Sequence, residues 1–68
     1  MNENPSAKEK AEYELRDLCF NKGLNDHDTE IAVDYFIHRL SHKEISVIHG
    51  ITQETSRGKK SKLKNRLK

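Results

Sequence analysis

Apolar residues recur along this chain at intervals of three and four, the spacing of one face of an α-helix. The pattern predicts an all-α fold, a small four-helix domain with helices at about 6–22, 26–38, 41–49 and 53–67. Residues 1–5 are expected to form a disordered tail, and residues 6–68 a single helix-turn-helix domain. The first helix has an apolar stripe of Ala7, Ala11, Leu15, Leu18 and Cys19.

The second predicted helix is the most apolar of the four, so we expect it to be the most buried. Its stripe of Ile31, Ala32 and Tyr35 is widened by Val33, Phe36, Ile37 and Leu40. In the third helix, Ile45 and Ile48 are expected to face the core. The fourth has only two strong apolar anchors, Leu63 and Leu67, which are four residues apart.

Capping residues and glycines mark the ends of these helices. Ser41 and Glu44 have the S-x-x-E spacing of a capping box. Gly50 can end the third helix because glycine adopts positive φ without strain. Thr52 can then cap the fourth helix. The remaining expected end signals are Gly23, Asn25 and Asp26.

Composition limits the size of the core and the class of protein. The chain has 68 residues, of which 32% are hydrophobic and 35% are charged. The hydrophobic core is therefore either small or completed by another protein or by a second copy of this chain. Its one cysteine, Cys19, cannot form an internal disulfide and is expected to be a small core residue. The sequence has no signal peptide and no run long enough for a membrane span. We therefore expect a cytoplasmic protein, or a fragment of one.

Charge is distributed unevenly along the chain. Residues 1–40 carry a formal charge of −4 and residues 41–68 one of +6, which gives the total of +2. Seven of the twelve residues from Arg57 to Lys68 are basic and none is acidic. Such asymmetry indicates a polyanionic partner at the C-terminal end.

A short capped helix, a glycine turn and a longer basic helix are typical of a helix-turn-helix. In such a unit the first helix crosses the DNA backbone and the second enters the major groove. The stretch LSHKEISVIHGITQETSRGKKSKLKNRL, residues 40–67, resembles the L-S-x-K-E-I-A-x-x-L-G-I-S-x-x-T-V pattern of LuxR-type response-regulator domains and of sigma factor region 4. The matching positions are Leu40, Ser41, Lys43, Glu44, Ile45, Gly50, Ile51, Thr52, Thr55, Leu63 and Leu67.

The chain departs from that pattern at several positions. Arg39 stands where a glycine normally ends the preceding helix, His49 replaces a buried leucine and Ser56 replaces a valine. We expect His49 to be at least half-buried and to need a hydrogen-bond partner, and Ser56 to weaken the core. LuxR-type domains commonly dimerise through a further C-terminal helix, which we do not expect here, so dimerisation in that manner is not predicted. A homodimer of another kind is still a possible assembly.

The outward positions of the fourth helix are the predicted DNA contacts. The residues expected to read base edges are Gln53, Glu54, Arg57 and Ser61, whose side chains match the donors and acceptors of the major groove. Those expected to contact phosphates are Lys43, Thr55, Lys59, Lys60, Lys62, Lys64 and Arg66. Gly58 is expected to weaken the helix, and close approach of the helix to DNA would explain why a glycine is present there.

The sequence supports other functions less strongly than DNA binding. We expect no enzyme activity and no cofactor, because the chain has no recognisable catalytic arrangement or phosphate loop. His38 and His42 are four apart, but Ser41 caps a helix between them, so we expect no metal site. The main alternative is a protein-interaction module that docks on RNA polymerase or another regulator through Val33, Phe36 and Val47. A part of a phage packaging or recombination machine would share the same motif.

Overall fold

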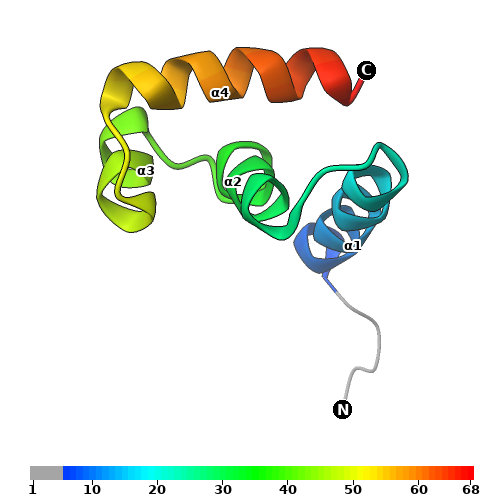
Figure 1. Ribbon diagram of the computed structural model, residues 1–68. Coiled ribbons are helices and arrows are strands. Elements are labelled where there is room, and N and C mark those ends of the chain that lie inside the picture. Colours follow the sequence, from blue (N-terminus) through cyan, green and yellow to red (C-terminus); the bar gives the residue numbers. More distant parts are fainter. Residues whose placement is uncertain (1–5) are drawn as a thin grey trace.

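Four α-helices joined by short connections make up the structure (Figure 1). The computed structural model describes residues 6–68, so the expected N-terminal tail lies outside the described residues. The helices are α1 (Ala7–Asn21), α2 (Asp26–Phe36), α3 (His42–His49) and α4 (Gln53–Arg66). Residues 6–68 contain no strand, and none of their helices is long and apolar enough to cross a membrane. The predicted all-α class with four helices is confirmed.

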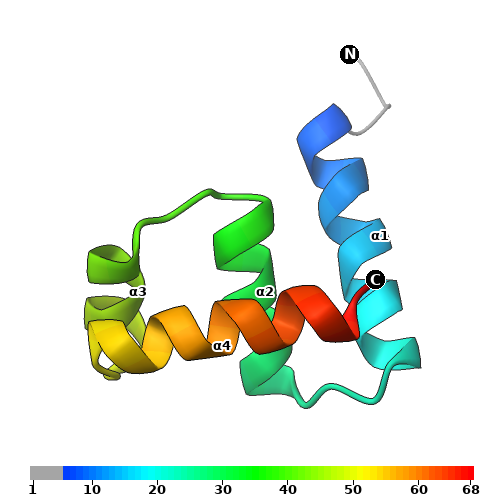
Figure 2. The same cartoon turned by 90° about the horizontal axis from the view of Figure 1, so that it is seen from above.

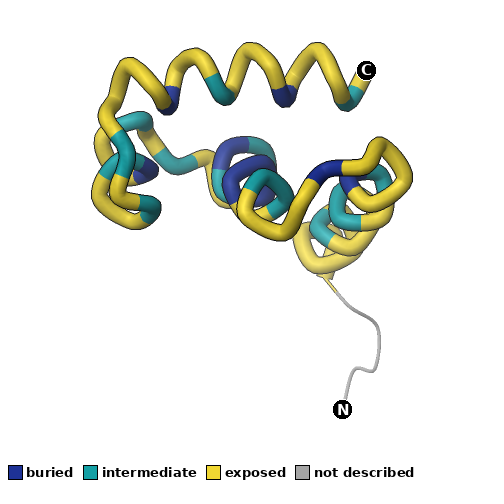
Figure 3. The backbone as a smooth tube through the Cα atoms, in the orientation of Figure 1, coloured by how far each residue is buried: buried dark blue, intermediate teal, exposed yellow. Residues whose placement is uncertain are grey.

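Helix α2 lies at the centre of the arrangement. Helix α4 crosses α2 and α3, while α1 packs beside α2 (Figures 1 and 2). The expectation that α2 is the most buried helix is confirmed, as the dark segments of Figure 3 show. The core cluster consists of Cys19, Leu24, Ile31, Ala32, Tyr35, Ile45 and Leu63. Cys19 is thus a core residue, and burial raises the pKa of its thiol.

The predicted end signals cap the helices as expected. Ser41 Oγ accepts a hydrogen bond from the Glu44 backbone N–H at 3.1 Å, and the Glu44 carboxylate accepts one from the Ser41 N–H at 3.1 Å. The capping box is therefore confirmed. Asn25 caps α2 by accepting from the Asp28 N–H at 2.7 Å. Gly50 has a φ of 66°, the left-handed conformation that favours glycine.

Helix α2 ends at Phe36, two residues before the predicted end at His38. The chain leaves the helix in a tight turn, in which the His38 N–H donates to the Val33 carbonyl at 3.1 Å and the Leu40 N–H to the Asp34 carbonyl at 3.0 Å. Within this turn Arg39 adopts a φ of 54°. Arg39 thus adopts the left-handed conformation that favours glycine, the residue found at this position in the pattern that the sequence resembles.

Three expectations about which side chains face the core are wrong. Ala7 and Ala11 are exposed, because α1 contacts α2 only through its C-terminal half. Ile48 is 60% exposed, because α3 turns His42, Ile45 and His49 toward its neighbours instead. Val33 was assigned both to the apolar stripe of α2 and to the surface left for a partner; it is buried at 1% exposure, which confirms the first assignment and contradicts the second.

Arg16 joins α1 to α2 by charged hydrogen bonds. Its Nη1 donates to Glu30 Oε1 at 2.7 Å and its Nε to Glu12 Oε2 at 3.0 Å. These bonds raise the pKa of Arg16, and the bond from Arg16 lowers the pKa of Glu30. The contact between α1 and α2 is therefore stabilised by charge at its exposed edge.

We expect Arg39→Gly to raise the free energy of unfolding by up to about 1 kcal/mol, because glycine adopts this φ without the Cβ clash. Gly50→Ala is the matched opposite: no atom lies within 4 Å of the added Cβ, so any loss reflects backbone strain alone. Urea denaturation of both variants measures the two effects. A destabilised Arg39→Gly would mean that the arginine side chain stabilises the fold more than its backbone strains it.

The stability of the protein should fall in acid partly through Glu30. Because its pKa is lowered in the folded state, its stabilising contribution is present above its ordinary value of 4.5 and is lost as pH falls through the lower, folded pKa. Glu30→Gln should therefore reduce the difference in unfolding free energy between neutral pH and about pH 3. Glu14→Gln, an exposed carboxylate on α1 outside this contact, is the control. Equal effects of the two variants would contradict this role of the Arg16–Glu30 pair.

Candidate nucleic-acid interface

The connection between α3 and α4 is only three residues long, from Gly50 to Thr52. The Ile51 N–H donates to the Ser46 carbonyl at 3.1 Å, and the half-buried Ile51 side chain packs against the core. Thr52 Oγ1 accepts from the Thr55 N–H at 3.0 Å and so begins α4. The angle between the two helices is thus held by local hydrogen bonds and by an apolar anchor.

A buried polar cluster of Tyr35, His42 and Ser56 links α4 to α2 and α3. The Tyr35 hydroxyl donates to the Ser56 carbonyl at 2.6 Å and also contacts Ser56 Oγ. His42 Nδ1 lies 2.8 Å from the same Oγ. Ser56 is fully buried, and no buried side-chain polar atom in the described part of the chain lacks a partner. Ser56 therefore replaces an apolar contact with a satisfied hydrogen-bond network.

This cluster was not predicted from the sequence. Ser56 was expected only to weaken the core, and His42 was considered only as a metal ligand. A usable signal was present, because an inward-facing serine requires a polar partner. Tyr35 and His42 were among several side chains with polar tips on the two neighbouring helices, so the sequence alone did not single them out.

A second polar contact joins α3 to α2. His49 Nε2 lies 2.6 Å from Asp34 Oδ2, and the two side chains are 11% and 17% exposed. The expectation that His49 is largely buried and needs a partner is confirmed. His27 packs edge-on against the His49 ring, with 5.5 Å between ring centroids. The α2–α3 contact thus replaces the expected leucine with a histidine–carboxylate pair.

The inner face of α4 is narrow. Ser56 and Leu63 are buried, and Leu67 is half-buried against the core. The predicted anchoring role of Leu63 and Leu67 is confirmed. Because these side chains face α2, the opposite side of α4 is left to solvent, as the yellow outer side of the helix in Figure 3 shows.

All four residues predicted to read bases are exposed on α4, three of them in its N-terminal half and Ser61 just beyond it. They are Gln53, Glu54, Arg57 and Ser61. Gln53, Arg57 and Ser61 are spaced four apart, so they lie near one another on successive turns. Gly58 is exposed in the same region, and no atom lies within 4 Å of where a Cβ would be. The helix surface is therefore open here to close approach by a ligand.

The residues predicted to contact phosphates are placed differently from one another. Lys43, Lys62 and Lys64 are exposed and form no ion pair within residues 6–68. The other four have partners within the fold. Thr55 Oγ1 accepts from Thr52 Oγ1 at 2.8 Å, and Lys59 Nζ lies 3.5 Å from Asp28 Oδ1. Lys60 Nζ lies 5.7 Å from the Tyr35 ring centroid, and Arg66 donates to the Lys22 carbonyl at 2.6 Å.

The two histidines considered for a metal site serve separate contacts. His38 lies 3.9 Å from a Glu12 carboxylate oxygen, whereas His42 belongs to the cluster around Ser56. Among residues 6–68, no group of three or more histidine, cysteine, aspartate or glutamate side chains is arranged to hold a metal ion.

Comparison of the chain with known protein families, with curated proteins and with solved structures gives no match.

Removing the Ser56 hydroxyl should destabilise the protein by about 1–2 kcal/mol, because Ser56→Ala leaves Tyr35 and His42 with fewer partners in a buried site. Combining Ser56→Ala with Tyr35→Phe should cost less than the sum of the two single changes, since both act on one network. Urea denaturation measures all three variants. Ser61→Ala, an exposed serine on the same helix, is the control and should change stability by less than about 0.5 kcal/mol. Equal losses for the two serine variants would contradict a structural role for the cluster.

Proposed function

We propose that this protein binds double-stranded DNA sequence-specifically, with α3 and α4 as a helix-turn-helix and α4 as the recognition helix. The observation that carries the proposal is the division of α4 into two sides. Ser56, Leu63 and Leu67 hold one side against the core, while the predicted base-reading residues are exposed together on the other. The resemblance of residues 40–67 to LuxR-type domains and sigma factor region 4 supports the same assignment.

The side chains at the start of α4 have the chemistry needed to read bases. Arg57 can donate two hydrogen bonds to guanine, Gln53 can form a bidentate pair with adenine and Glu54 can accept from cytosine. They lie in the N-terminal half of the helix, the part of a recognition helix that meets base edges. Ser61 follows one turn after Arg57 and extends this surface.

Charge on α4 supports a polyanionic partner. The helix carries six basic residues and one acidic residue, Glu54. In this proposal Lys43, Lys62 and Lys64 contact phosphates most directly, because they are exposed and have no internal ion pair within residues 6–68. Lys59, Lys60 and Arg66 contribute less, since each must share its charge with a partner inside the fold. In this proposal the protein is a small transcriptional regulator.

A second candidate function is docking on another protein, such as RNA polymerase or a regulator. Val47 is 76% exposed and lies beside Ile48 on α3, where the two line a shallow hollow with Lys43 and Glu44. Exposed apolar patches of this kind mark protein contacts. This surface lies on α3 and shares only Lys43 with the predicted DNA contacts.

Fluorescence anisotropy with duplex DNA at several salt concentrations tests the DNA proposal. The logarithm of affinity should fall linearly with the logarithm of salt, with a slope of about −0.9 per phosphate contacted. Lys62→Ala should weaken binding to all sequences alike and reduce that slope by about 1. After selection of a preferred site, Arg57→Ala should cost about 1–3 kcal/mol there and relax the preference at one base pair.

Lys10→Ala is the matched control, because it removes the same charge from an exposed position on α1. It should leave the salt dependence nearly unchanged. No binding at low salt would contradict the proposal and favour the protein-docking function, which Val47→Ser would then be expected to impair. If Lys10→Ala and Lys62→Ala had equal effects, binding would follow net charge and not the α4 surface.

A further inference from the structure

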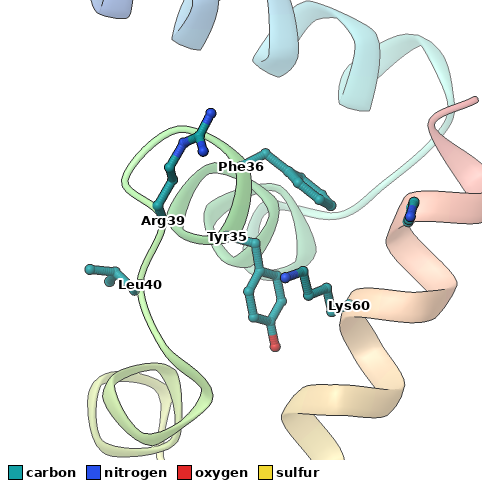
Figure 4. Close-up of a pocket in the computed structure, with 6 residues that line it drawn as sticks. Tyr35, Phe36, Arg39, Leu40 and Lys60 are labelled. Carbon is teal, nitrogen blue, oxygen red and sulfur yellow. The ribbon is translucent and has the colours of Figure 1, made fainter.

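A groove of about 450 Å³ lies between the end of α2 and the middle of α4, and its α4 residues, Lys60 and Lys64, each follow a predicted base-reading residue by three positions. Figure 4 shows Tyr35 and Phe36 projecting from α2 and Lys60 approaching from α4. Its apolar lining comes from Tyr35, Phe36 and Leu40, and its polar lining is entirely cationic, from Arg39, Lys60 and Lys64. The groove therefore suits an occupant that carries both apolar or aromatic groups and negative charge.

The three cations of the groove have no carboxylate partner among the residues described. Lys60 Nζ lies over the Tyr35 ring, and no ion pair involves Arg39 or Lys64 in residues 6–68. Arg39 also holds a left-handed backbone conformation, at φ 54°, which an arginine adopts only at a cost. Unfavourable backbone conformations of this kind concentrate at ligand contacts. The groove is thus a cationic site with unused binding capacity.

The same chain carries a surface of matching chemistry on α1. Glu9, Tyr13, Asp17 and Phe20 are spaced three and four apart, so they share one side of the helix, which we term the acidic stripe. This side is turned away from Leu15 and Cys19, which face α2. Tyr13 is 70% exposed and Phe20 is 81% exposed. The acidic stripe thus offers two exposed aromatic side chains flanked by carboxylates, the combination that the groove suits.

We propose that a second copy of this chain occupies the groove, with the acidic stripe of one copy seated on the cationic groove of the other. Carboxylates of the stripe would meet Arg39, Lys60 and Lys64, and Tyr13 and Phe20 would cover the apolar lining. Each copy offers both surfaces, and in the proposed closed two-fold pair both contacts form, whereas an open head-to-tail chain would give masses above that of two chains. Aromatic and arginine side chains are also the residue types that dominate the energetics of such interfaces. The pairing does not rest on the DNA-binding proposal, but it uses Lys60 and Lys64, which are also predicted phosphate contacts, so the paired form would leave these two lysines less available to DNA.

A charge-swap experiment tests this pairing on the full chain. One variant carries Glu9→Lys and Asp17→Lys, and the other carries Arg39→Glu and Lys64→Glu. Sedimentation equilibrium at low salt should give the mass of two chains for the unaltered protein and of one chain for each variant, because like charges then face each other. An equimolar mixture of the variants should recover the mass of two chains, since every contact regains opposite charges. Recovery in the mixture also shows that both variants are folded.

Apolar contact is tested separately from charge. Tyr13→Ser with Phe20→Ser should shift the unaltered protein toward single chains at low salt. Val47→Ser is the matched control, because it removes an equally exposed apolar side chain from α3, outside the proposed interface. It should leave the mass unchanged.

Several results would overturn the proposal. The first is a single-chain mass for the unaltered protein at low salt up to millimolar concentration. The second is a pair that persists in both swapped variants, or one that Val47→Ser disrupts while the α1 changes do not. The third is a mixture that stays monomeric although circular dichroism shows both variants to be folded. If the Arg39 and Lys64 variant lost only DNA binding, the groove would be a phosphate contact instead.

Discussion

Three helices of this protein meet at the buried hydroxyl of Ser56. Tyr35 reaches it from α2 and His42 from α3, so one side chain of α4 fixes its position against both neighbours. Because hydrogen bonds are directional, this contact sets the rotation of α4 about its axis more strictly than an apolar contact of similar size. That rotation determines which side chains of α4 face solvent, and the candidate interface depends on it.

The same contact explains how such a charged helix is held in a small fold. Apart from Leu63 and Leu67, α4 has no large apolar side chain with which to pack. Polar contacts also hold α4 against the rest of the fold. Ser56 forms them near the start of the helix, and Arg66 donates to the Lys22 carbonyl near its end. Polar anchors leave more positions free for basic residues than a broad apolar stripe would. A highly basic surface and a small core are therefore two results of one arrangement.

Local signals allowed the helices to be predicted well. Ser41 with Glu44, Gly50 and Thr52 act through hydrogen bonds or backbone conformation within a few residues, and each ends or begins a helix as predicted. The end of α2 was harder, because Arg39 adopts a conformation that its own side chain disfavours and that only the surrounding turn imposes.

Orientation and long-range contacts were predicted less well. Ile48 is apolar and correctly spaced for the core, yet the bonds of His42 and His49 turn α3 so that it faces outward. For α4, exposure of Gln53, Glu54, Arg57 and Ser61 follows from the pattern around Leu63 and Leu67. The partners of Lys59, Lys60 and Arg66 do not, since they lie on helices far along the chain.

The Tyr35–Ser56 contact also bears on how the chain reaches this fold. In the part of the chain described, α1 packs on α2, α2 on α3 and α3 on α4, so most helix pairs are neighbours in sequence. Apart from the Arg66–Lys22 bond between the ends of α4 and α1, only the pairing of α2 with α4 skips a helix, and the Tyr35–Ser56 bond closes that loop across 21 residues. Chains dominated by local contacts fold quickly, because little loop-closure entropy is lost before contacts form. We therefore expect fast folding, with the pairing of α2 and α4 as the main long-range step.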